Sequence, residues 1–161
     1  MHPRNSLIAA SAAFAFAALA IPAGDTAAQT MKSVAGTYSI VKVAADYGEN
    51  PRGTMILTAD GHYSIFVARA TLPKFASGSR VKGTAEEMKA VTLGSIAHIG
   101  KYSIDDGGKA ITFRIATSTF PNWDGTTQKR PMKISGDTMT YTVAAPSAGG
   151  APGEVVWRRV K

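Results

Sequence analysis

The sequence contains no cysteine among its 161 residues. This absence excludes disulfide bonds, catalysis by a thiolate, metal sites built on thiolates and the lipidated cysteine of a bacterial lipoprotein. Stability must therefore come from a buried core and from a sheet that leaves few edges unpaired, which favours a closed barrel. The chain length corresponds to one domain.

The sequence also lacks an apolar run long enough to span a membrane. Leu7–Ile21 is uncharged, but it is shorter than the roughly 20 residues that a transmembrane helix needs. It follows a basic start and precedes small residues, an order typical of a secretory signal peptide. We therefore expect a signal peptide at 1–28, cleaved after Ala28, and a periplasmic or secreted domain at 29–161 without a transmembrane segment. Cleavage after Ala20 and retention as an N-terminal anchor are the alternatives.

Acidic residues are few, 11 against 18 Lys and Arg, which gives a formal net charge of +7. Such an excess of positive charge is found in proteins that bind nucleic acid or anionic surfaces. Here the basic residues are scattered, and only Lys129-Arg130 and Arg158-Arg159 are adjacent pairs. No basic motif interleaved with aromatic residues accompanies them. We expect a basic soluble surface and no nucleic-acid partner.

Histidine is scarce as well, with three in the chain. His62 and His98 remain once the signal peptide is removed, and neither has a partner at the H-x-H or HExxH spacing of a metal site. The sequence also has no P-loop, no GxSxG motif and no dinucleotide-binding motif placed after a strand. We therefore expect neither a metal nor a cofactor.

Apolar and polar residues alternate in short runs separated by turn residues. In 137–145, for example, Met139, Tyr141 and Val143 share one face and threonines share the other, which is typical of a half-buried strand. Hairpin turns rich in Asp and Gly connect such runs. The expected strands lie at about 35–46, 53–59, 62–69, 97–104, 110–118, 126–134, 137–145 and 154–160. This spacing predicts an all-β fold, an antiparallel up-and-down barrel or a sandwich.

One helix signal interrupts the strands. Thr84 and Glu87 form a capping box, which predicts a short helix inside the long loop between the third and fourth strands. Long loops of this kind often carry function.

Four short motifs distinguish the sequence: Phe75–Gly78 (FASG), Gly83–Glu87 (GTAEE), His98–Tyr102 (HIGKY) and Phe120–Arg130 (FPNWDGTTQKR). They resemble the motifs of the bacterial and fungal lipocalin-like domain proteins, and the resemblance covers nearly the whole expected mature chain. It implies an eight-stranded up-and-down barrel around an apolar ligand cavity, and it implies no single activity. Arg114 departs from the histidine or neutral residue that the resemblance implies there.

Strand parity places an arginine inside this barrel. In 126–134, Gln128 and Arg130 share a face with the apolar Met132. A buried charge is costly, so Arg130 must find a carboxylate, several carbonyl groups or an anionic ligand. The planar guanidinium suits recognition of a ligand carboxylate or carbonyl. The candidate protein partners are Asp46, Glu49 and Glu154.

The same parity directs His98 and Tyr102 inward, and it directs Phe113 inward on the next strand. A histidine in a half-apolar pocket can transfer protons near neutral pH, and a nearby tyrosine can donate to a developing negative charge. The alternative is a cavity histidine satisfied by a neighbouring hydroxyl or carbonyl group.

Two loops carry aromatic residues that can reach the mouth of a barrel. Trp123 either covers the cavity or simply plugs the barrel end, and Asn122 beside it can orient a polar group of a ligand. Phe75, in the long loop before the helix, is a second candidate for a lid.

Two functional hypotheses follow. In the first, an exported lipocalin-like barrel binds a small, largely apolar molecule whose carboxylate or carbonyl group is recognised by Arg130, Gln128 and His98. In the second, the protein is a cofactor-free isomerase, cyclase or lyase, with His98 transferring a proton and Tyr102 or Arg130 stabilising negative charge. A purely structural envelope protein would need no cavity at all.

Overall fold

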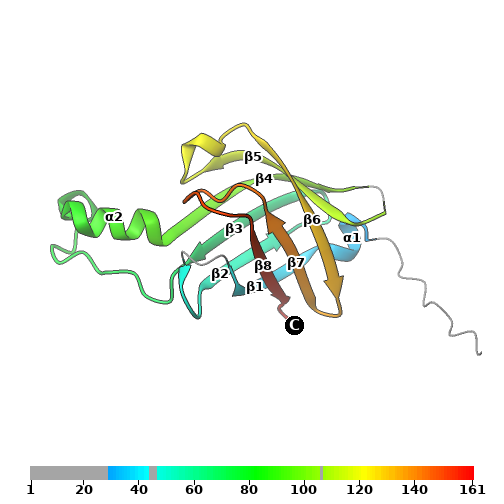
Figure 1. Ribbon diagram of the computed structural model, residues 1–161, viewed down its shortest axis with the longest axis horizontal. Helices are drawn as coiled ribbons and strands as arrows, with labels where there is room; N and C mark the ends of the chain where they lie inside the picture. Colours follow the sequence, from blue (N-terminus) through cyan, green and yellow to red (C-terminus); the bar gives the residue numbers. More distant parts are fainter. Residues whose placement is uncertain (1–28, 44–46, 106) are drawn as a thin grey trace, which may run out of the picture.

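Eight strands pair in chain order and close into a barrel in the part of the chain that the computed structural model describes, residues 29–43, 47–105 and 107–161 (Figure 1). The strands are β1 (Gly36–Lys42), β2 (Arg52–Leu57), β3 (His62–Ala68), β4 (Ser95–Ile104), β5 (Ala110–Ser118), β6 (Thr127–Ser135), β7 (Thr138–Val143) and β8 (Gly153–Arg159). Every neighbouring pair is antiparallel, and β8 closes on β1. The expected up-and-down barrel is confirmed and the sandwich is excluded.

Every strand boundary lies within two residues of the expected one, except the end of the first strand. The first expected strand, 35–46, is β1, which ends at Lys42, and residues 44–46 lie outside the described residues. The signal peptide expected at 1–28 also lies outside them. β4 begins at Ser95, directly after helix α2 (Ala85–Gly94), with no loop between the helix and the strand.

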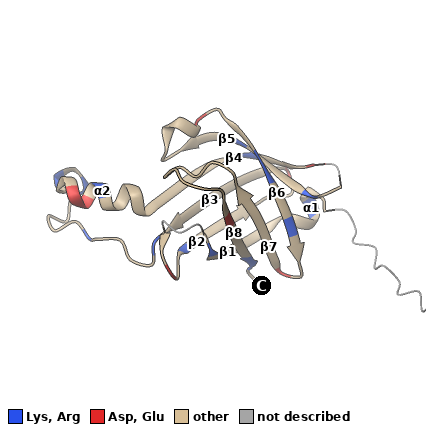
Figure 2. Ribbon diagram, in the orientation of Figure 1, with Lys and Arg blue, Asp and Glu red and all other residues tan. Residues whose placement is uncertain are grey.

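The inward side chains of the eight strands form one core. Alternation is visible in the burial of β3, where Tyr63, Ile65 and Val67 are buried and the residues between them are exposed. The largest side chains in the core include Trp157 and Tyr38, both almost fully buried. Lys and Arg lie on several strands and near α2, and do not gather into one stripe (Figure 2).

A bulge in β5, opposite β4, adjusts the register beside the candidate histidine. The pairing of β4 with β5 shifts between Ile99 and Gly100. A Cβ atom at Gly100 would lie 2.1 Å from the backbone oxygen of Arg114, a distance that no side chain can occupy. Glycine therefore permits the close approach of the two strands, and His98 and Tyr102 both still face inward.

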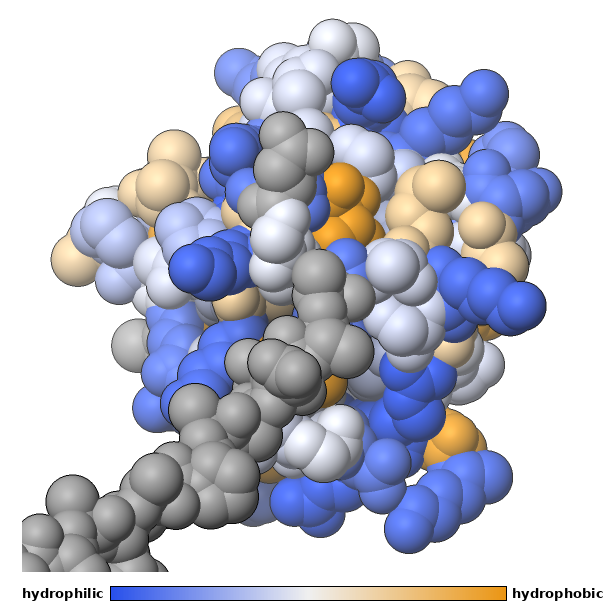
Figure 3. Space-filling model, turned by 90° about the vertical axis from the view of Figure 1, so that its right-hand side faces the viewer, coloured by the Kyte–Doolittle hydropathy of each residue, from blue (hydrophilic) through white to orange (hydrophobic). Residues whose placement is uncertain are grey.

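One end of the barrel is closed by helix α1 (Met31–Val34), which the sequence did not predict. Val34 is buried there and accepts a hydrogen bond from the Tyr38 hydroxyl at 2.6 Å. Arg159 of β8 donates to the backbone oxygens of Ser33 and Ala35 and stacks on the Tyr38 ring at 4.8 Å. Figure 3 views the molecule from the α1 side, where much of the surface is hydrophilic.

The opposite end carries the remaining short helices. Helix α2 extends away from the barrel wall beyond this end, preceded by η2 (Arg80–Lys82), and η3 (Pro121–Trp123) lies at the barrel rim between β5 and β6 (Figure 1). The short helix predicted from the capping box is therefore present, with Thr84 as its N-cap. Within the described residues, no helix has both the length and the apolar character that crossing a membrane requires.

Candidate functional site

A cavity opens at the end of the barrel that carries α2 and η3. Its volume is about 60 Å³, counted as the space open to the centre of a water molecule. Four groups of residues line it: apolar strand residues, aromatic residues, a histidine with an arginine, and a loop before β8. They are Val43, Ile65, Val67, Ile96, Val143 and Val155; Tyr47, Trp123, Tyr141 and Trp157; His98 and Arg130; and Pro146, Ser147 and Ala148. The walls are thus mostly apolar and aromatic, as in small-molecule sites generally.

Arg130 supplies a positive charge to this cavity, and no carboxylate of the described residues pairs with it. The side chain is 4% exposed, and its guanidinium carbon lies 5.0 Å from the ring centres of both Phe113 and Tyr141. Its Nη2 donates to Gln128 Oε1 at 2.7 Å, and its Nε has no hydrogen-bond partner among the described residues. The two rings and one amide oxygen compensate only part of the cost of burying a guanidinium.

His98 also lines the cavity, and its side chain is likewise 4% exposed. Its Nδ1 is 2.9 Å from the Tyr63 hydroxyl oxygen, and no other hydrogen bond reaches the ring in the described structure. Because a buried hydroxyl proton needs an acceptor, and Nδ1 is the partner of this hydroxyl, we assign Tyr63 as the donor. The neutral ring then carries its proton on Nε2, so His98 offers the cavity a donor.

Burial keeps this ring uncharged. Burial, together with the smaller effect of the positive charge of Arg130, lowers the pKa of His98 to about 3. Burial also raises the pKa of Tyr63. Both groups are therefore neutral at pH 7, and their hydrogen bond joins two uncharged side chains.

Trp157 contributes a third nitrogen donor. It lines the cavity, and its Nε1 is buried without a hydrogen-bond partner among the described residues. Arg130 Nε, Trp157 Nε1 and His98 Nε2 are all N–H groups. These three N–H groups have no acceptor among the described residues, so a ligand can satisfy them only with acceptor atoms.

The comparison with known families agrees with this barrel. The model of the lipocalin-like domain family matches residues 29–160. The chain belongs to the lipocalin-like domain family. A relative from Aspergillus oryzae (strain ATCC 42149 / RIB 40), the 4'-hydroxy-3'-methoxypropiophenone carrier protein ppsC, is 27% identical over 86 residues. The aligned region covers 50% of this chain and 78% of the relative.

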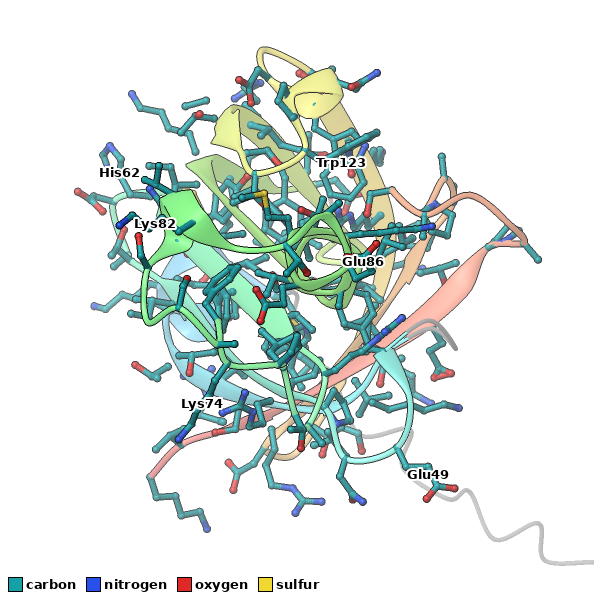
Figure 4. All side chains as sticks on the ribbon, turned by 90° about the vertical axis from the view of Figure 1, so that its left-hand side faces the viewer. Glu49, His62, Lys74, Lys82, Glu86 and Trp123 are labelled. Carbon is teal, nitrogen blue, oxygen red and sulfur yellow. The ribbon has the colours of Figure 1, made fainter. Side chains whose placement is uncertain are left out.

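Three of the residues singled out in the sequence come together in the lipocalin-like cavity. His98, Arg130 and Trp123 line it, and the rings of His98 and Trp123 meet edge-on with 5.6 Å between centroids. Phe113 and Gln128 lie behind this surface, where the ring supports Arg130 and the amide accepts from it. Trp123 is seen at the rim of the barrel in Figure 4.

Tyr102 lies elsewhere, contrary to expectation. Its hydroxyl donates to the backbone oxygens of Thr58 and Met31, at 2.7 and 3.2 Å, beside the closed end of the barrel. The parity was right, since Tyr102 faces inward, but Tyr102 lies four residues after His98 on β4, about 13 Å along the strand, and so at the opposite end from the cavity. It therefore cannot act together with His98.

Two loop residues also lie apart from the cavity. Asn122 is exposed on η3, and Phe75 packs against Gly83, where a Cβ atom would lie 2.5 Å from its ring. Phe75 thus stabilises the loop before α2 and does not form a lid. Of the carboxylates considered for Arg130, Glu49 and Glu154 are exposed and neither pairs with it, and Asp46 lies outside the described residues.

Sequence reasoning missed the residues that complete the site. Tyr63 and Tyr141 are inward residues of clear strands, so parity could have indicated them, as it could Trp157. The loop residues 146–148 carry no pattern that points to a cavity wall. Among the described residues, no cluster of three or more His, Asp or Glu side chains could hold a metal ion.

Proposed function

We propose that this lipocalin-like barrel is a carrier-type protein that binds a small, largely apolar molecule bearing hydrogen-bond acceptor oxygens. The observation that supports it most is the set of N–H donors in the cavity wall that lack acceptors. Among the described residues, Arg130 Nε and Trp157 Nε1 are buried without partners, and His98 presents Nε2–H between apolar walls. A carbonyl or carboxylate oxygen would relieve the cost of these unsatisfied groups.

The named ligand of the Aspergillus oryzae relative has suitable chemistry. A methoxypropiophenone is an aromatic ketone, with an apolar ring and oxygen atoms that accept hydrogen bonds. In this chain, the ring of such a molecule would contact aromatic walls such as Trp123 and Tyr141, and its carbonyl oxygen would face Arg130. We therefore infer that the ligand of this protein is a compact aromatic molecule with a carbonyl or carboxylate group.

Binding is favoured over acid–base catalysis by the state of His98. A general acid or base works best when its pKa lies near the operating pH. With a pKa of about 3, His98 is a weak base at pH 7 and carries no second proton to donate. Its role in the proposal is to donate a hydrogen bond from Nε2.

Export belongs to the same proposal and rests on the sequence of residues 1–28. The expectation is a mature chain that begins at Gln29 and is found outside the cytoplasm. Fractionation of the source cells and N-terminal sequencing of the purified protein test this directly. A cytoplasmic chain that retains residues 1–28 would contradict it.

Intrinsic fluorescence provides the test of binding, because both tryptophans of the chain line the cavity. Titration with 4'-hydroxy-3'-methoxypropiophenone or 4-methylbenzoate should change the emission of Trp123 and Trp157 saturably. Propylbenzene, which has no oxygen, should bind much more weakly because it leaves the donors unsatisfied. Equal affinity for propylbenzene would contradict the proposal.

A matched pair of arginine variants tests the role of Arg130. Arg130→Met should weaken binding of 4-methylbenzoate by about tenfold or more, the size of a lost charge-assisted hydrogen bond. Arg114→Met makes the same change on neighbouring β5, where the side chain is exposed, and should bind as the wild type does. An unchanged affinity in Arg130→Met would remove Arg130 from the site.

A further inference from the structure

A second hollow adjoins the cavity on the side of α2. Its volume, counted in the same way, is about 170 Å³, and it is called the vestibule here. Its walls come from the end of α2, the start of β4, the segment before η3 and the loop before β8. The lining residues are Tyr47, Thr92, Leu93, Ser95, Ile96, Thr119, Phe120, Ser147 and Ala148. Figure 4 looks onto this end of the molecule, with α2 in front of the barrel and Trp123 at its rim.

The vestibule and the cavity share part of their walls. Tyr47, Ile96, Ser147 and Ala148 line both hollows. The aromatic rings are continuous in the same direction, because Trp123 meets His98 at 5.6 Å and Phe120 at 5.7 Å between centroids. The two hollows are therefore neighbours on either side of a shared wall that includes Ile96.

The walls of the vestibule are uncharged. No Lys, Arg, Asp, Glu or His side chain lines it among the described residues. The Ser95 hydroxyl donates to Val91 O at 2.8 Å and the Thr119 hydroxyl accepts from Ala97 N at 2.9 Å, so these groups already have partners. Leu93 is 50% exposed and presents an apolar surface that nothing in the described structure covers fully.

We propose that the ligand is elongated, with its oxygen-bearing ring in the cavity at Arg130 and an uncharged apolar chain that runs past Ile96 and Ala148 into the vestibule against Leu93. This inference rests on the proposed function and adds the substrate class. The occupant is one molecule, because the two hollows share four wall residues and the charged anchor lies in only one of them.

The geometry sets the length of the chain. Ser95 lies three positions before His98 on β4. Because a strand rises about 3.3 Å per residue, the vestibule extends about 10 Å beyond the histidine. Each methylene group that becomes buried should strengthen binding by up to about fourfold. The gain should stop once the chain reaches past Leu93 into solvent.

A homologous series of 4-alkylbenzoates, from methyl to octyl, tests the inference by fluorescence titration of the full mature chain. We expect the dissociation constant of the wild type to fall with each added methylene until the vestibule is filled. A dissociation constant that does not change with chain length would overturn the inference while leaving the proposed function intact, provided that 4-methylbenzoate still binds. Failure of 4-methylbenzoate to bind would overturn the proposed function and the inference together.

Two variants connect the length dependence to the vestibule. Thr92→Trp places a large side chain in the vestibule, at a residue that does not line the cavity, and should remove the dependence on chain length, with the affinity for 4-methylbenzoate preserved. Leu93→Gln should reduce the gain for the longest chains, whereas Met88→Gln, which introduces the same residue at a 40% exposed position of α2 outside the vestibule, should not. Retention of the full chain-length dependence in Thr92→Trp would show that the chain lies elsewhere.

Discussion

At the scale of single residues, the uncharged state of His98 makes stability depend on pH. The pKa of His98 is about 3 in the folded protein, whereas an unperturbed histidine has a pKa of 6.5. Between these values the unfolded chain binds a proton that the folded chain does not bind, so the free energy of unfolding decreases as the pH falls. The stabilisation is complete above pH 6.5 and is lost progressively toward pH 3.

A substitution separates this effect from other titrations. His98→Asn keeps an amide near the position of Nδ1, within reach of Tyr63, but it does not titrate. We expect urea unfolding to show that the wild type loses about 1 to 2 kcal/mol more than His98→Asn between pH 7 and pH 5. An identical loss in both proteins would mean that His98 becomes protonated in the folded state without cost.

At the scale of secondary-structure elements, the bulge of β5 depends on one glycine of the facing strand β4. Gly100→Ala would place a methyl group against the backbone oxygen of Arg114, so the strands must separate. We expect the free energy of unfolding to decrease by about 1 to 3 kcal/mol, the usual cost of an overpacked site. Chemical denaturation measures it, and a variant as stable as the wild type would show that β4 and β5 can move apart freely.

Helix α2 should respond independently of the barrel. The Thr84 hydroxyl accepts from Glu87 N, and the Glu87 carboxylate accepts from Thr84 N and Ala76 N. Thr84→Ala should destabilise the helix by about 1 kcal/mol, which would accelerate amide exchange across Ala85–Gly94 about fivefold with little change in global stability. Thr92→Ala, the same substitution without a capping role, is the control. Faster exchange throughout the barrel would contradict the independence of α2.

The elements also show how far sequence reasoning reaches. The alternation of residues predicts all eight strands, and the inward orientation of His98 and Arg130, because these properties are local. The closing role of α1 is not local, since it depends on Arg159 and Tyr102 reaching a four-residue helix across the barrel. For the same reason, parity could not show that Tyr102 and His98 lie at opposite ends, or that Arg130 would have aromatic rings beside it and no carboxylate partner among the described residues.

At the scale of the whole molecule, the cavity costs stability in the absence of a ligand. Arg130 is buried without a counter-ion in the described structure, and donors of Arg130 and Trp157 are unsatisfied. Groups arranged for a ligand commonly destabilise the free protein in this way. The closed sheet, in which β8 pairs with β1, and the plug formed by α1 supply the stability that allows such an end to remain open.

This balance predicts that, without a ligand, Arg130→Met is as stable as the wild type or more stable by about 1 kcal/mol of unfolding free energy. The reason is that an apolar side chain of similar length replaces a buried unpaired charge. Ligand reverses the order. At a concentration of 4-methylbenzoate 100 times its dissociation constant, the wild type should gain about 2.7 kcal/mol, and the variant should gain much less at the same concentration. Thermal unfolding of both proteins with and without 4-methylbenzoate measures the crossing. If Arg130→Met is clearly less stable than the wild type without ligand, the rings of Phe113 and Tyr141 and the amide of Gln128 already compensate the charge, and Arg130 is part of the fold before it is part of the site.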